Sequence, residues 1–145
     1  MRTVPCESRR SYVEGLMINK SEGTKFEDEL QAIFGRNEFW CHLFQQNVRG
    51  QPCDLIAAKN RRCLLIDAKD CKRDKFPLSR VEDNQFYSMQ RWVMIAKFEA
   101  YFAFKLSDGR IKIAPFNKVK LDLQAGVKSY EKEDFEQFSS IEEIL

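Results

Sequence analysis

The sequence predicts a single α/β domain over residues 1–145, with a central β-sheet flanked by helices. Two observations lead to this prediction. Segments at about 52–69 and 99–116 are apolar and are each interrupted by a short polar turn, which is the pattern of a β-hairpin. Segments at about 22–35 and 80–96 repeat apolar residues at the spacing of one helical face. A chain of this length can bury a core without disulfides or structural metals.

The composition limits the chemistry that the protein can use. Hydrophobic residues make up 43% and charged residues 32%, as in globular proteins, and no apolar run is as long as a membrane span. The five cysteines include no C-x-x-C pair, so we expect reduced thiols in a cytoplasmic protein rather than a zinc site or a disulfide framework. With His42 as the only histidine, catalysis would depend on carboxylates and lysines.

Charge is distributed unevenly along the chain. The net charge is only +2, but residues 59–80 carry a local charge of +5 and residues 131–145 a local charge of −5. A polyanion such as DNA would bind the first stretch and avoid the second. The alternative is that both runs are simply hydrated faces of the protein.

The N-terminal part is expected to contain an arm, a helix and a strand. Residues 1 to about 20 are basic and show no regular period, which predicts an arm that orders on a partner. A helix is predicted from about 22 to 35, and an aromatic strand from 39 to 44. Thr24 and Glu27 match a capping box, so a purely structural role is open to Glu27.

The first hairpin is expected to bring polar side chains together. Its turn is assigned to Lys59–Asn60, a register that places Asp54 opposite Leu65. Side chains alternate across a strand, so Leu65 shares its face with two polar residues further along, Asp67 and Lys69. The side chain of Asp54 is expected on this same face, diagonal to that of Asp67 and within roughly 7–8 Å of it.

Apolar neighbours indicate that these polar residues lie on buried strands. A buried carboxylate is costly unless it is paired or bound to a metal. A divalent cation could therefore bridge Asp54 and Asp67. The alternative is an internal salt bridge between Lys69 and one of the two carboxylates.

The C-terminal half is expected to add a helix, a hairpin and a tail. The helix, at about 80–96, has one polar residue on its apolar face, Gln85, whose amide could bind a phosphate, a hydrated metal ion or a backbone group. The hairpin at 99–116 is followed by a mixed stretch at 117–129. An acidic tail at about 130–145 reads as one or two short amphipathic helices.

Taken in chain order, the polar residues resemble a known group of enzymes. A helix with Glu27, then Asp54, then Asp67 two residues before a lysine resembles the PD-(D/E)XK nuclease superfamily. Over about residues 22–116 the chain is similar to the RecU-type Holliday junction resolvases of Gram-positive bacteria and their phages, in the segments Gly23–Glu27, Asp67–Lys69 and Lys75–Leu78 and in Gln85.

The chain departs from these resolvases at two points. Asp67 stands where they usually have glutamate, an exchange that the superfamily tolerates. The segment between Glu27 and Asp54 is short, which leaves little room for the long stalk that RecU-type enzymes insert into the junction centre.

The resemblance implies a restriction-endonuclease-like α/β fold with a central mixed sheet. It also implies that Mg²⁺, with Mn²⁺ as a substitute, is held by three carboxylates and one backbone carbonyl, those of Glu27, Asp54, Asp67 and Ala68. Lys69 would touch the attacking water or the scissile phosphate, and Gln85 would complete the catalytic set. Four basic residues are candidates for DNA phosphate contacts, namely Lys25, Arg73, Lys75 and Arg80.

The function implied is that of a Mg²⁺-dependent, structure-selective endodeoxyribonuclease. Its expected substrate is branched DNA, above all the four-way Holliday junction. It would act as a homodimer in the cytoplasm of a bacterium or a phage-infected host. One alternative is another nuclease of the superfamily, which cuts nicks, flaps or duplex ends. A second is a DNA-binding module that keeps the fold without the activity.

Overall fold

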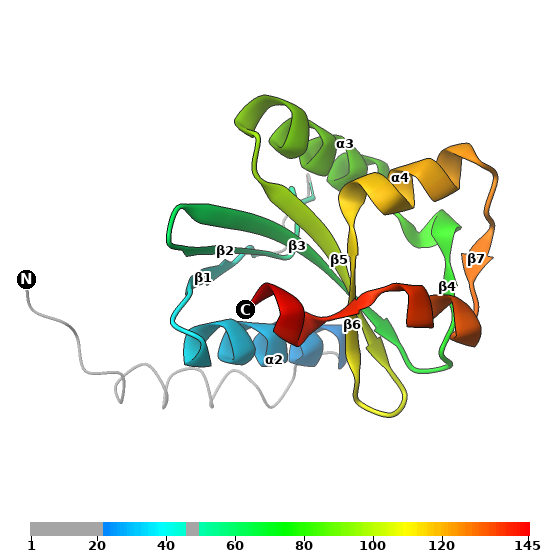
Figure 1. The fold of residues 1–145 in the computed structure, drawn as a ribbon, viewed down its shortest axis with the longest axis horizontal. Coiled ribbons are helices and arrows are strands. Elements are labelled where there is room, and N and C mark those ends of the chain that lie inside the picture. The colour runs from blue at the N-terminus through cyan, green and yellow to red at the C-terminus, as the bar shows by residue number, and fades with distance from the viewer. Residues whose placement is uncertain (1–21, 46–49) are drawn as a thin grey trace, which may run out of the picture.

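A computed structural model describes residues 22–45 and 50–145 and shows a β-sheet between helical layers (Figure 1). The predicted basic arm at about 1–20 lies outside the described residues. The elements, in chain order, are α2 (Glu22–Arg36), β1 (Trp40–Leu43), β2 (Leu55–Lys59), β3 (Arg62–Cys71), β4 (Phe76–Pro77), the 3-10 helix η1 (Leu78–Arg80), α3 (Asp83–Arg91), the π-helix η2 (Trp92–Ala96), β5 (Glu99–Leu106), β6 (Ile111–Pro115), α4 (Phe116–Gln124), β7 (Ser129–Tyr130), the 3-10 helix η3 (Lys132–Gln137), β8 (Ser139–Ser140) and the 3-10 helix η4 (Ile141–Ile144).

The main sheet has six strands in the order β1-β2-β3-β5-β6-β8. Strands β3 and β5 are parallel, and the other neighbours are antiparallel. The predicted α/β architecture, a central mixed sheet flanked by helices, is therefore confirmed. Strand β3 is paired along both edges, so its side chains are held in fixed positions above and below the sheet.

Helix α2 covers one face of the sheet, as Figure 1 shows. Its apolar residues Phe26, Leu30 and Phe34 are buried against Leu55 and Ile66 of the two strands below. The predicted helix at 22–35 is thus confirmed to within one residue.

The start of α2 bears on the alternative role of Glu27. The helix begins at Glu22, so Thr24 lies inside it and is not an N-cap residue. Glu27 is the sixth residue of the helix, beyond the position from which a side chain reaches back to the N-cap amide. The capping-box interpretation of Glu27 was therefore wrong.

Helices α3 and α4 cover the other face. The helix predicted at 80–96 begins later, at Asp83, because residues 78–80 form a 3-10 turn after Pro77. It then continues beyond Arg91 as the π-helix η2, which ends at Lys97 in a left-handed conformation (φ 63°). Helix α4 was not predicted, since the stretch 117–129 had been read as mixed.

The acidic tail predicted at about 130–145 is built into the fold. It forms 3-10 helices and two short strands, of which β8 pairs with β6 at the edge of the main sheet. The rings of Phe135 and Phe138 pack against Phe104 of β5, with ring centroids 5.4 and 5.9 Å away. Ile141 and Ile144 are buried in the same cluster as α2.

Two further properties concern the described part of the chain. None of its helices has both the length and the hydropathy needed to cross a bilayer. Its four cysteines, Cys41, Cys53, Cys63 and Cys71, are free thiols. Burial raises the pKa of Cys71 to about 12, so this thiol is neutral at pH 7 and a poor nucleophile.

Candidate active site

The β2–β3 hairpin turns at Asn60 and Arg61, both with positive φ (49° and 65°). The predicted turn at Lys59–Asn60 was therefore wrong by one residue, and the strand register differs from the prediction by two. Leu65 pairs with Ile56 instead of facing Asp54. Because two is an even number, Leu65 and the residues that alternate with it keep the predicted face.

The corrected register moves Asp54 closer to Asp67 than predicted. Leu55 is the first residue of β2 and pairs with Ile66, and the Asp54 amide donates to the Ile66 carbonyl at 3.1 Å. The Asp54 carboxylate accepts the Ala68 amide, with 2.6 Å between Oδ2 and N. Asp54 is buried and its carboxylate lies next to that of Asp67.

Asp67 occupies the most costly position for a carboxylate in this group. It is completely buried, and neither of its oxygens accepts a hydrogen bond from the residues that the structure describes. Burial, and then the neighbouring Asp54 carboxyl, raise the pKa of Asp67 well above its usual range. A buried carboxylate left in this state is expected to bind a proton or a cation.

Lys69 is the nearest cation to Asp67. Its ammonium group lies 3.1 Å from Asp67 Oδ2, and the side chain is buried. The same ammonium donates to Gln85 Oε1 at 3.4 Å. The internal salt bridge, which was the alternative to a metal site, is therefore present, but among the described residues it leaves the hydrogen-bonding capacity of Asp67 unfilled.

Gln85 reaches this group from the helical layer. It is the third residue of α3 and is buried, like Met89 one turn later. Alternation along β3 puts Asp67 and Lys69 on the face that α3 covers, because Leu65 packs in the same cluster as Met89. The structure thus brings together four of the predicted catalytic residues, Asp54, Asp67, Lys69 and Gln85.

Glu27 comes from a different element than these four residues. It lies on α2, half-buried, and the apolar side of α2 packs against the opposite face of the sheet. Within the part of the chain that the structure describes, no three His, Cys, Asp or Glu side chains form a group that could hold a metal. The role of Glu27 as a third metal ligand stays a prediction.

The predicted phosphate contacts fall into two places. Arg73, Lys75 and Arg80 are exposed and line a hollow of about 360 Å³ beyond the end of β3, together with Asp70. Lys25 is exposed on α2 and is not among the residues that line this basic hollow.

Two of the three predicted phosphate contacts at the hollow already have partners in the protein. The ammonium of Lys75 pairs with Glu131 at 3.3 Å. The guanidinium of Arg80 lies over the Phe76 ring, 5.4 Å from its centroid. Neither contact buries the charge, so both side chains can still meet a phosphate.

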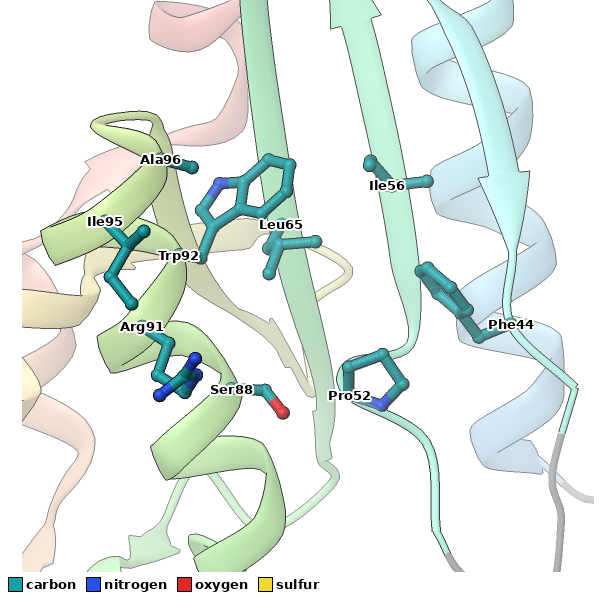
Figure 2. A pocket seen from close by; sticks show the side chains of 9 residues that line it. All are labelled: Phe44, Pro52, Ile56, Leu65, Ser88, Arg91, Trp92, Ile95 and Ala96. Carbon is teal, nitrogen blue, oxygen red and sulfur yellow. The ribbon is translucent and has the colours of Figure 1, made fainter.

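A second hollow, of about 420 Å³, was missed by the sequence analysis. Figure 2 shows Trp92, Ile95 and Ser88 on one side, and Phe44 and Pro52 on the other. Its walls come from segments far apart in the chain, so no local pattern could predict it. The one available signal was the alternation of aromatic rings in the strand predicted at 39–44.

Comparisons with known proteins place this site in a familiar fold. Neither a protein-family model nor a curated protein sequence matches the chain. Among solved structures, the chain is similar to Hjc of Archaeoglobus fulgidus, described as a Holliday junction resolvase from an archaeal hyperthermophile. The TM-score is 0.61 and the identity 22%, over 86% of this chain and 95% of Hjc. The chain therefore has the restriction-endonuclease-like α/β fold that its sequence predicted.

Proposed function

We propose that this protein is a metal-dependent endodeoxyribonuclease that hydrolyses phosphodiesters in branched DNA, with the four-way junction as its preferred substrate. The observation that carries the proposal is the buried Asp67 carboxylate, which has a second carboxylate beside it and a buried lysine 3.1 Å away. A protein that only binds DNA has no use for such a costly group. The fold shared with Hjc supports the same reading.

The donor set fits a hard divalent cation. Asp54 and Asp67 offer carboxylate oxygens, which Mg²⁺ prefers and which Mn²⁺ also accepts. The amide and carbonyl of one residue in a strand point to the same edge, and the Ala68 amide points toward Asp54. The Ala68 carbonyl therefore lies on the edge where the cation would be held, and Glu27 would add a third carboxylate.

The bound cation would make a hydroxide available near neutral pH and neutralise charge on the reacting phosphate. Lys69 would add positive charge for the same phosphate and hold a proton close to it. Gln85 accepts a hydrogen bond from the Lys69 ammonium and so fixes its direction. Asp67 and Gln85 together keep the ammonium in place before DNA arrives.

Substrate binding would use the basic hollow beyond β3. Arg73, Lys75 and Arg80 would contact phosphates, which positions the backbone without reading the bases. Lys25 would contact DNA from α2. Recognition would then depend on the shape of the branch and would weaken steeply with salt.

We propose further that the enzyme acts as a homodimer, because two sites related by symmetry would cut two strands of a junction in a balanced way. We place its action in the cytoplasm of a bacterium or a phage-infected host. The RecU-like and phage-type resemblance belongs to this proposal, and it is carried by Asp67–Lys69, Lys75–Leu78 and Gln85.

The test is a cleavage assay with Mg²⁺, with and without a chelator, on a four-way junction, a flap, a nicked duplex and a linear duplex. Asp67→Asn and Lys69→Ala are expected to abolish cleavage. Asp108→Asn and Lys128→Ala are the matched controls, because both residues are exposed and lie outside the site.

Three outcomes separate the alternatives. Cleavage that shows no preference for the junction would replace the resolvase with a nuclease for flaps, nicks or ends. Binding of DNA without cleavage of any substrate would leave a DNA-binding module. Full activity in both site variants would show that the chemistry takes place elsewhere.

A further inference from the structure

Strand β1 and the residue after it carry three aromatic rings in a row on one face. Trp40, His42 and Phe44 are spaced two apart at the edge of the sheet, so their side chains point the same way. The rings of Trp40 and His42 are stacked, with centroids 6.3 Å apart and planes 11° apart. The His42 and Phe44 rings follow edge to face at 5.5 Å.

This aromatic stripe is open to solvent at one end. The Trp40 side chain is 64% exposed and His42 is also exposed, whereas Phe44 is half-buried. Strand β1 is the outermost strand of the described sheet on this side, so the rings have side chains of a neighbouring strand along one flank only. Tryptophan in such a position costs solvation without stabilising a core, which points to a binding surface.

At its buried end the aromatic stripe enters the apolar hollow of Figure 2. Phe44 forms one wall of the hollow and Trp92 of η2 the other, above a floor of Ile56 and Leu65. The hollow of about 420 Å³ is lined mostly by apolar atoms, and Arg91 supplies the one charged side chain among its lining residues. A flat, apolar group with an anion attached would suit these walls.

The hollow lies beside the carboxylate site along β3. Leu65 in its floor lies two residues before Asp67 on the same face of β3. Phe44 is tied to the site from the other side, because its amide donates to the Asp54 carbonyl at 2.9 Å. A ligand in the hollow would therefore sit next to whatever group Asp54 and Asp67 act on.

We infer that the aromatic stripe and the hollow bind unpaired nucleobases of the DNA strand that is cut. This inference rests on the proposed function and adds to it that the bases beside the scissile phosphate are unstacked and received by the protein. Every base has a π face, so rings that bind by stacking accept any sequence. Arg91 would neutralise a phosphate of the same strand.

A second copy of the chain is the competing occupant of the aromatic stripe. The observations favour bases, because the hollow is concave, the rings are arranged for stacking, and the row leads to the carboxylates. An interface between copies would need none of these.

The test measures DNA binding by tryptophan fluorescence. A chelator is present, so that no metal ion is available for cleavage. The ligands are oligothymidylate and an abasic strand of the same length, which has the phosphates without the bases. Quenching by oligothymidylate is expected, with an affinity at least tenfold above that of the abasic strand. Trp92→Phe leaves Trp40 as the only tryptophan, so its quenching reports on the aromatic stripe alone.

Substitutions at Trp40 then test whether this ring stacks on the bases. Trp40→Ala is expected to lower the affinity for oligothymidylate roughly tenfold and to leave that for the abasic strand unchanged. Trp40→Leu keeps an apolar side chain and is expected to lose the same affinity, because it cannot stack. Leu121→Ala, at an exposed apolar residue of α4, is the control without effect.

The inference would be overturned if the wild type bound the two strands with equal affinity. It would also be overturned if Trp40→Ala left the affinity for oligothymidylate unchanged. Sedimentation in which Trp40→Ala converts a dimer to a monomer would overturn it as well, since the aromatic stripe would then join two copies. Failure of the proposed function looks different, because the wild type would bind oligothymidylate in preference to the abasic strand but cut no DNA. Base-independent binding with intact cleavage would remove only the inference.

Discussion

The Asp54 carboxylate accepts the amide of Ala68, the residue that separates Asp67 from Lys69. This hydrogen bond fixes Asp54 against the middle of the Asp67–Lys69 segment, so both carboxylates are held by β3. Their closeness is a consequence of the backbone, and it is therefore present before any cation or DNA is bound.

Replacing Asp67 with asparagine is expected to stabilise the metal-free protein at neutral pH. The folded-state pKa of Asp67 is raised, so the folded protein binds its proton more tightly than the unfolded chain does. The destabilisation is absent below the usual aspartate pKa of about 4 and grows as pH rises through the folded-state value. Asp67→Asn should increase the free energy of unfolding, measured with urea, by about 1–3 kcal/mol near pH 7. Near pH 3 it should leave that free energy unchanged.

Asp54→Ala is the matched comparison. It removes the acceptor of the Ala68 amide and should lower stability by about 1–3 kcal/mol. If both variants lose stability at pH 7, the raised pKa of Asp67 does not describe the metal-free protein.

Lys69→Met is expected to reduce the rate of the chemical step by about 10²–10⁴-fold, because it keeps the buried stem and removes the ammonium. Gln85→Met should cause a smaller loss, since Gln85 acts by directing Lys69. Single-turnover cleavage with saturating enzyme measures this step. Lys128→Ala should cleave at the wild-type rate, and a Lys69→Met enzyme that does the same would contradict the role of the ammonium.

Removal of positive charge from the basic hollow should appear in the salt dependence of DNA binding. Arg73→Ala and Arg80→Ala are each expected to reduce the slope of log affinity against log salt by about 1. Lys75→Ala should have less effect, because Lys75 is already paired with Glu131. Glu131→Gln should therefore increase affinity. Unchanged slopes in the two arginine variants would exclude the hollow as a phosphate site.

Glu27→Gln tests the third ligand. Mg²⁺ that binds only the folded protein raises Tm, in proportion to the logarithm of its concentration over Kd. If Glu27 is a ligand, the variant should need about tenfold more Mg²⁺ for the same rise. Glu29→Gln, on the same helix, is the control and should respond as the wild type does. An identical response in Glu27→Gln would leave the site with the two aspartates.

Sequence alone predicted which face of β3 would be polar, because alternation of side chains depends only on the strand. The register between β2 and β3 was harder to predict. Arg61 occupies a left-handed turn position (φ 65°) that is usually taken by glycine or asparagine, so the pattern favoured the preceding dipeptide. The convergence of Asp67 and Lys69 survived this error because alternation along β3 does not depend on the partner strand.

Helix α4 was missed for a similar local reason. Phe116 was counted as the end of a strand, which removed the first member of the buried helical row that it forms with Val119. Leu121, exposed on the opposite side, obscured the period further. No local pattern predicts the apolar hollow, since Phe44 and Trp92 come to its opposite walls only through the packing of η2 on the sheet.

The position of Ile141 and Ile144 has a consequence for how the chain folds. These residues of η4 share a core with Phe26 of α2, and β8 just before them completes the main sheet. The two ends of the described chain therefore depend on each other, with most of the sequence between them. Without residues 139–144 this core would lack two buried isoleucines and the main sheet would lack β8, so both are completed by a segment far from α2 in the sequence.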